Sequence, residues 1–296
     1  MRKTKNLLLA LATCLLLACG TTNTVPITGR KQSLMVSDQQ VLSLSQQQYQ
    51  QYMAQSKVST NATNTAMVKR VGQRLANSVE SYLAANGMSD ELKYYQWQFN
   101  LVQDQSVNAF CMPGGLIVVY EGLLPVTQDE ASLAIVLGHE IAHAVAKHSA
   151  ERISNAYKQE YALQAIGTVA QAGGVSADLL QLGSIVASLG SQVWTSGFSR
   201  KQESEADHMG LVFAAMAGYD PQVAVSFWKR MSQATGGGSN SIFSDHPSDE
   251  TRIKQIQGWL PEAQAYYKPA GNATSTPNAK TGKTIRTLHI SGQKKK

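Results

Sequence analysis

The feature that most constrains the fold of this chain is the segment HEIAH at residues 139–143. Apolar residues precede it with helical spacing, so it is predicted to lie in a long helix over residues 127–155. His139 and His143 would then lie about 40° apart around the helix axis, where both imidazoles can bind one metal ion. Glu140 is rotated by about 100° and would reach a water on the metal's open side. The pattern predicts a metal-dependent hydrolase with a carboxylate general base.

A catalytic zinc ion usually takes three protein ligands and one water, so a third ligand must come from elsewhere. The downstream candidates are Glu203, Glu205, Asp207, His208 and His246. Glu203 and Asp207 share one face of a helix expected over 200–217, so one can bind the metal while the other orients a ligating imidazole. Glu205 points about 200° away from Glu203 and is expected to be a surface acid. The alternative interpretation is that residues 200–207 form only a charged, solvated helix face.

The rest of the chain indicates an α+β fold that is mostly helical, with a small sheet. The expected extended segment covers residues 20–35, the helices 37–57, 64–86, 200–217, 221–234 and 248–261, and the strands 94–103 and 116–120. Residues 160–196 are rich in small and uncharged side chains. They are interpreted as packed helices that lie between the metal ligands and cover the cleft. The alternative is a pair of membrane-embedded helices.

Residues 1–18 have the features of a signal peptide, in which basic residues precede an apolar run too short for an ordinary membrane span. The run ends in LLAC, and Cys19 therefore resembles the lipidated cysteine of a bacterial lipoprotein signal. Gly20 replaces the Asp that favours inner-membrane retention in enteric bacteria, so the periplasmic face of the outer membrane is expected. The alternative is an ordinary cleaved signal with a chance cysteine.

The net charge of +6 does not indicate nucleic-acid binding. Ten of the 26 basic residues lie in the first 18 residues and in 268–296, which contain no acidic residue. The residues between them hold 16 basic and 20 acidic side chains. A nucleic-acid partner is therefore not expected, because the body of the protein offers no basic surface.

Five segments, taken in order, resemble the gluzincin zinc peptidases and, within them, the HtpX, CAAX prenyl protease and BepA/Oma-type family. They are VPITGRKQ at 25–32, NAFCMPGG at 108–115, HEIAH at 139–143, ESEAD at 203–207 and the HP…R element at 246–252. The resemblance covers about residues 25–260. It implies a zincin-type catalytic domain over 36–262, preceded by an anchor and extended segment over 19–35. A basic, disordered tail is expected over 263–296.

The resemblance also implies roles for individual residues. His139, His143 and Glu203 would bind Zn²⁺, and Glu140 would act as the general base. Asp207 would orient one of the ligating histidines. Two further residues are expected at the catalytic centre: His246, as a gate at the metal or an oxyanion stabiliser, and Arg252 near it. The alternative for His246 is a surface residue beside a helix.

A substrate-binding strand is expected next to this centre. Its predicted residues are Asn108, Ala109, Phe110, Gly114, Gly115 and Leu116. The strand over 116–120 would lie at the edge of the sheet and pair with an extended substrate backbone. The alternative is an ordinary core strand. Cys111 is expected to be a small buried hydrophobe.

These features predict a lipid-anchored zinc endopeptidase that degrades misfolded or unassembled cell-envelope proteins. The chain lacks the membrane helices of HtpX and the prenyl proteases and the C-terminal repeats of BepA, so those placements and substrates are not carried over. The oligomeric state is left open. Three alternatives remain: a latent or non-catalytic chaperone or assembly lipoprotein, a structural lipoprotein with a closed metal site, and an aminopeptidase.

Overall fold

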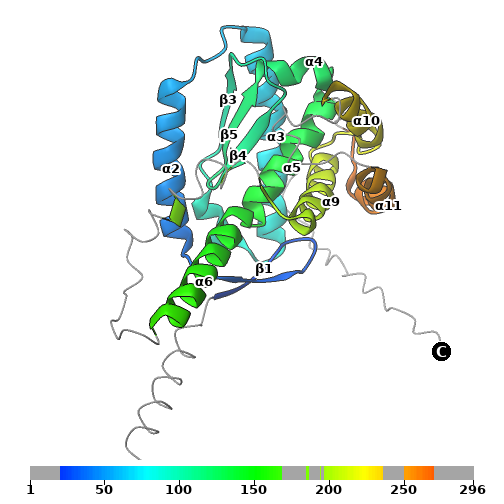
Figure 1. Ribbon diagram of the computed structural model, residues 1–296. Helices are drawn as coiled ribbons and strands as arrows, with labels where there is room; N and C mark the ends of the chain where they lie inside the picture. The colour runs from blue at the N-terminus through cyan, green and yellow to red at the C-terminus, as the bar shows by residue number, and fades with distance from the viewer. Residues whose placement is uncertain (1–20, 169–184, 187–193, 195–196, 236–249, 270–296) are drawn as a thin grey trace, which may run out of the picture.

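The computed structural model describes residues 21–168, 185–186, 194, 197–235 and 250–269 of the chain (Figure 1). The predictions for Cys19, for His246, for the tail beyond residue 269 and for most of 160–196 lie outside these residues. The described part is mostly helical with small sheets, which confirms the predicted fold class. Within it, no helix combines the length and apolar character needed to cross a membrane.

A three-stranded sheet lies at the centre of the fold, in the order β3 (Gln98–Val102), β5 (Leu116–Tyr120) and β4 (Ala109–Met112). β5 runs parallel to β3 and antiparallel to β4. The prediction that 116–120 is an edge strand is therefore wrong. Its continuous apolar sequence LIVVY is typical of a strand buried on both faces. Among the described strands, β4 occupies the edge next to the helix that carries the histidine pair.

Helices cover both faces of the sheet (Figure 1). On one face, alternate strand residues pack with α3 (Ala62–Ala85), α5 (Glu130–Val145) and α9 (Arg200–Met216) in the larger apolar core. On the other face, the intervening residues pack against α2 (Asp38–Gln55) and α6 (His148–Thr168). This alternation follows from the two-residue period of a strand. A 3-10 helix, Ser89–Tyr94, precedes β3, so the strand expected over 94–103 begins only at Gln98.

The helix expected over 127–155 is divided into two helices. α5 begins after Asp129, whose carboxylate accepts a hydrogen bond from the Ser132 amide. Thr127 belongs instead to the short helix α4 (Leu124–Thr127), and Gln128 separates the two with a φ of 66°. After α5, Lys147 has a φ of 55°, which interrupts the helix before α6 starts at His148. Because left-handed φ values do not fit a right-handed α-helix, each of these residues interrupts the regular helix at its position.

The remaining elements frame the C-terminal side of the core. α10 (Val223–Thr235) and α11 (Glu250–Tyr266) pack together, and α11 also packs along α9. α11 continues through Pro261 to Tyr266, past residue 262, where the domain was expected to end. Ala263, in this last part of the helix, is fully buried in the core. The expected extended segment at the N-terminus is an antiparallel hairpin of β1 (Thr21–Thr24) and β2 (Lys31–Leu34).

Candidate metal centre

Three buried side chains direct donor atoms at one point, as the sequence predicts. The Nε2 atoms of His139 and His143 are 3.1 Å apart, and each lies 3.4 Å from a carboxylate oxygen of Glu203. Ligands placed tetrahedrally at zinc–nitrogen and zinc–oxygen bond lengths would be about 3.3 Å from one another. The separations and the two-nitrogen, one-oxygen donor set therefore fit a catalytic zinc ion.

The close approach of two helices brings these donors together. His139 and His143 lie on α5, one turn apart, and Glu203 lies near the start of α9. α5 and α9 contact each other at Gly138 and Gly210, where a β-carbon on either residue would collide with the opposite backbone. The small residues let the helix backbones approach closely enough for a short Glu side chain to reach both imidazoles.

Asp207 lies behind His139, on the side of the ring opposite the metal donors. Its Oδ1 atom is 2.8 Å from His139 Nδ1 and accepts a hydrogen bond of 2.5 Å from Arg252 Nη2. Burial raises the pKa of Asp207, but the charge of Arg252 and the hydrogen bond with His139 leave that pKa below its usual value. The carboxylate thus stays ionised and holds the proton of His139 on Nδ1, which leaves Nε2 free to bind a metal.

Arg252 reaches the centre through Asp207. Its guanidinium stacks over Trp228 at 3.4 Å from the ring centroid, and its Nη2 atom lies 3.3 Å from His139 Nδ1. The structure therefore places Arg252 at the rear of His139, whereas the sequence analysis expects it at the catalytic centre. Its contacts are those of a residue that positions His139.

Glu140 is buried on the side of α5 that faces β4. Burial raises the pKa of the Cys111 thiol on β4, and the nearby Glu140 charge raises it further. The candidate general base and the edge strand are thus neighbours. Cys111 itself is a buried free thiol, as predicted.

The electrostatics of the site favour a cation between the donors. Burial lowers the pKa of His139, but the hydrogen bonds with Asp207 and Glu203 outweigh burial and raise it to about 9. In the metal-free protein, a proton on His139 would therefore balance the buried carboxylates. A bound divalent cation would take over that role and release the proton.

His143 is supported by a second chain of contacts that the sequence analysis misses. Its Nδ1 atom is 2.8 Å from Nδ1 of His148, and Nε2 of His148 is 3.0 Å from Glu205 Oε2. Burial lowers the pKa of His148 even though Glu205 raises it, so this imidazole is neutral. No helical spacing rule joins His143 to His148, because the left-handed backbone of Lys147 interrupts the helix between them.

Glu205 is buried, so the prediction of a surface acid is wrong. The N-terminal segment covers it: Thr28 Oγ1 and Arg30 Nε donate hydrogen bonds of 2.5 and 2.7 Å to its carboxylate. Burial raises the pKa of Glu205, but the hydrogen bonds from His148, Thr28 and Arg30 outweigh burial and lower it to about 2. The predicted direction of Glu205 around the helix axis, away from Glu203, was correct. That face of α9, however, packs against other parts of the protein and not against water.

Comparison with known proteins identifies the family. Residues 62–260, more than half of the chain, match the family model described as Peptidase family M48. The chain belongs to peptidase family M48. This match and the names of the relatives confirm the predicted metalloendopeptidase class and the resemblance to Oma-type zinc metallopeptidases.

Named M48 relatives occur in eukaryotes and bacteria. The mitochondrial metalloendopeptidase OMA1 of Schizosaccharomyces pombe is 36% identical over 246 residues, which cover 81% of this chain and 67% of that protein. The metalloprotease LoiP of Escherichia coli is 30% identical over 226 residues, which cover 76% of this chain and 82% of that protein. A putative beta-barrel assembly-enhancing protease of Vibrio cholerae is 30% identical over 163 residues, which cover 52% of this chain and 33% of that protein. The chain spans a third to two thirds of the OMA1 proteins of fission yeast, Arabidopsis thaliana and Saccharomyces cerevisiae.

The predicted substrate-binding residues of this M48 chain fall into two groups. Asn108, Ala109, Phe110 and Leu116 are buried in or next to β4 and β5. Of these, Ala109 belongs to the α5 side of the sheet, while Phe110 and Leu116 belong to the α2 side. Gly114 and Gly115 form the turn between the strands, with φ values of 93° and 80°.

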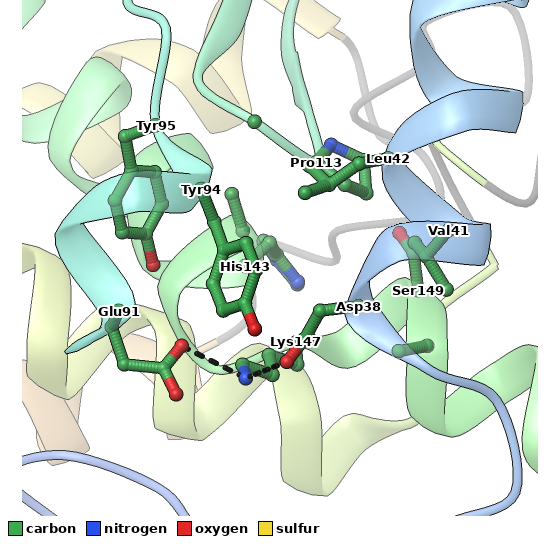
Figure 2. Close-up of a pocket in the computed structure, with 13 residues that line it drawn as sticks. Asp38, Val41, Leu42, Glu91, Tyr94, Tyr95, Pro113, His143, Lys147 and Ser149 are labelled. Carbon is green, nitrogen blue, oxygen red and sulfur yellow. Dashed lines mark hydrogen bonds and ion pairs between the residues drawn. The ribbon is translucent and has the colours of Figure 1, made fainter.

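A small pocket lies beside His143, the second histidine of the candidate metal centre (Figure 2). Its lining includes His143, the turn residues Pro113 and Gly114, and Leu42 of α2. Lys147 closes one side, where its ammonium bridges the carboxylates of Asp38 and Glu91 at 2.9 and 2.8 Å. Gly114 and Leu42 also line a larger groove along the glutamine-rich face of α2. The β4–β5 turn therefore adjoins open space on the α2 side of the sheet.

Proposed function

We propose that this protein is a zinc-dependent endopeptidase. The observation that carries the proposal is the convergence of His139 Nε2, His143 Nε2 and a Glu203 oxygen at separations of 3.1 to 3.4 Å. Glu140 follows His139 on α5 and lies near Cys111 of the edge strand β4. Three protein donors leave a fourth position open for water, which is typical of catalytic rather than structural zinc sites.

The side chains of the site have separate tasks in peptide hydrolysis. A bound zinc ion would supply Lewis acidity toward the water and the peptide carbonyl. Glu140 accepts the proton of the attacking water and returns it to the leaving amine. Asp207 holds His139 in the tautomer whose Nε2 faces the site. β4 is the edge strand that packs against α5, and its residues are buried. If it were uncovered, its backbone would pair with an extended peptide, which would give binding with little sequence preference and cleavage at internal bonds.

The proposed setting is the cell envelope, with the protein held at the periplasmic face of the outer membrane through lipidated Cys19. The signal-like N-terminus supports this placement, as do bacterial relatives named LoiP and beta-barrel assembly-enhancing protease. The proposed substrates are misfolded or unassembled envelope proteins, because backbone pairing at an edge strand requires an unfolded segment. No observation favours a nucleic-acid partner.

Cleavage of an unfolded protein by the purified full-length chain tests the proposal. The substrate is N-terminally acetylated, so that an aminopeptidase would leave it intact. The chain is compared with its Glu140→Gln variant, and each is assayed with and without a chelator. Glu262→Gln, the same chemical change at a residue with a 44% exposed side chain, is the matched control.

Internal cleavage by the wild type and by Glu262→Gln, abolished by the chelator and by Glu140→Gln, is the expected result. An inert wild type that binds one zinc ion per chain would contradict it and would favour the latent or chaperone alternative. His246→Ala would then show whether His246 blocks the centre.

A further inference from the structure

We propose that Arg30, in the N-terminal hairpin, is a positioning residue for the metal ligand His143 and acts on it through Glu205 and His148. This inference rests on the proposed function only in requiring that His143 binds a metal. It gives a task to the segment 25–32, which the sequence analysis singles out and which contributes no metal ligand.

The first step is the hydrogen-bond chain from the ligand to the carboxylate. If Nε2 of His143 is to bind a metal, its proton must be on Nδ1, which lies 2.8 Å from Nδ1 of His148. The Nδ1 atom of His148 must then accept this hydrogen bond, so the proton of His148 is on Nε2. There it donates to Glu205 Oε2 at 3.0 Å. With a metal on Nε2 of His143, this arrangement gives every ring nitrogen and the Glu205 oxygen a partner.

The second step is the clamp that holds Glu205 in place. Arg30 donates to Glu205 through Nε at 2.7 Å and to both oxygens of Glu151 through Nη1 and Nη2, at 2.7 and 2.9 Å. Thr28 donates to the other oxygen of Glu205 at 2.5 Å. Glu205 lies on α9 and Glu151 on α6, so one guanidinium joins the helix that carries Glu203 to the helix that begins at His148.

The same segment also contacts the break between α5 and α6. The side-chain amide of Gln32 donates to the backbone carbonyl of Ala146 at 2.9 Å, immediately after α5 ends. Arg30 Nη2 in turn lies 3.2 Å from Gln32 Oε1. The hairpin (Figure 1) therefore contacts the turn that places His148 behind His143 as well as the carboxylate that holds His148.

The arrangement around His143 parallels the one around His139. Each ligating imidazole is backed by a hydrogen-bond path that ends in a buried carboxylate of α9, and an arginine from a distant segment pairs with each carboxylate. For His139 the pair is Asp207 with Arg252, and for His143 it is Glu205 with Arg30. The difference is that His148 is interposed on the second path. Such outer hydrogen bonds orient the ligand ring and raise metal affinity.

Removal of Arg30 would leave the buried Glu205 without its main counter-charge. A buried carboxylate in that situation moves away from its present position toward water, since an uncompensated charge is costly inside a protein. That movement removes the acceptor of His148, and His143 then loses the contact that sets its ring orientation. The expected consequence is weaker metal binding without loss of a metal ligand.

The test is a zinc titration of the metal-free, full-length chain in competition with a chromogenic chelator. Arg30→Met should weaken Zn²⁺ binding by roughly tenfold, and His148→Phe by roughly 10- to 100-fold. Lys31→Met is the matched control. It is the same substitution on the next residue, at an exposed lysine whose ammonium donates to Thr24 across the hairpin, and it should leave affinity within twofold. The visible spectrum of the Co²⁺-loaded chain should change for Arg30→Met and not for Lys31→Met.

A double-mutant cycle separates positioning from general destabilisation. The effects of Arg30→Met and His148→Phe on Zn²⁺ affinity should be strongly non-additive, because both break one path. Those of Arg30→Met and Asp207→Asn should be close to additive. If Arg30→Met does not fold, Thr28→Val replaces it in both cycles. That variant removes one hydrogen bond to Glu205 with little change in side-chain shape.

Three results would overturn the inference: a folded Arg30→Met variant with wild-type zinc affinity and Co²⁺ spectrum, an equal loss in Lys31→Met, or additivity between Arg30 and His148. A wild-type chain that binds no zinc would instead overturn the proposed function. The two failures are therefore distinguishable in a single titration series.

Discussion

Gly138 of α5 and Gly210 of α9 touch backbone to backbone. A β-carbon on Gly138 would lie 2.6 Å from the Gly210 carbonyl oxygen, and a β-carbon on Gly210 would lie 2.5 Å from the backbone nitrogen of His139. Both distances are far inside van der Waals contact, and the obstructing atoms are backbone rather than a mobile side chain. The contact lies directly beside His139, so the spacing of the two helices sets the geometry of the candidate metal centre.

Gly210→Ala should therefore damage both stability and metal binding. The extra methyl group forces the helices apart, which costs about 1–3 kcal/mol for an overpacked core and moves Glu203 relative to His139. Chemical denaturation and zinc titration would measure the two effects. Gly258→Ala is the control, because nothing lies within 4 Å of its added β-carbon in α11. That helical substitution should stabilise the protein by about 0.5–1 kcal/mol. Equal behaviour of the two variants would contradict the role of the contact.

Asp207→Asn should lower the affinity for Zn²⁺ by roughly 10- to 100-fold while the chain remains folded. The amide keeps the shape of the side chain but loses the charge that accepts from His139 and pairs with Arg252. Competition with a chromogenic chelator provides the measurement. Asp90→Asn, at an exposed residue of the 3-10 helix before β3, should bind zinc as the wild type does.

The ion pair between Arg30 and Glu151 should make stability depend on pH in the acid range. Burial raises the pKa of Glu151, but the hydrogen bonds from Arg30 and Gln202 outweigh burial and lower it below the usual 4.5. A carboxyl group with a depressed folded-state pKa stabilises the protein above its unfolded-state pKa. That contribution is lost as the pH falls below about 4.5 and through the folded-state value.

Urea unfolding of the metal-free chain between pH 6 and pH 3 would show this loss. The Glu151→Gln variant should have a shallower pH dependence than the wild type, whereas Glu262→Gln should retain the wild-type slope. A Glu151→Gln curve parallel to that of the wild type would show that the ion pair does not contribute.

Cys111 should be unreactive in the folded protein. Its thiol is buried in β4, and burial together with the Glu140 charge raises its pKa well above the usual value, so little thiolate is present. Alkylation followed by peptide mapping should label Cys111 at least 100-fold more slowly in the native chain than in urea. Rapid native labelling would indicate that β4 opens to solvent.

Local sequence patterns predict the helical part of the metal centre well. The i and i+4 spacing of His139 and His143 places both rings on one face of any helix that contains them, and the same holds for Glu203 and Asp207. Most helix ranges also agree with the structure, because the apolar period and the capping residues are local signals.

The errors occur where contacts distant in sequence decide the outcome. The strand over 116–120 is central because β3 and β4 pair with its two sides, which its own apolar run does not specify. The helix expected over 127–155 breaks at Lys147, whose left-handed backbone is held by ion pairs to Asp38 and Glu91. Neither partner is near Lys147 in the chain.

The sequence by itself determined that His139 and His143 share one helix face and that Glu203 and Asp207 share another, since helix geometry requires only neighbours one turn apart. It did not determine that the two faces meet, or which residues stand behind the histidines. Glu205 is buried because the hairpin, 175 residues earlier in the chain, covers it with Arg30, and His148 reaches His143 because the helix is interrupted at Lys147 between them. Tertiary structure decided these contacts, because burial and ion pairing depend on which distant segments pack together and not on the period of any one helix.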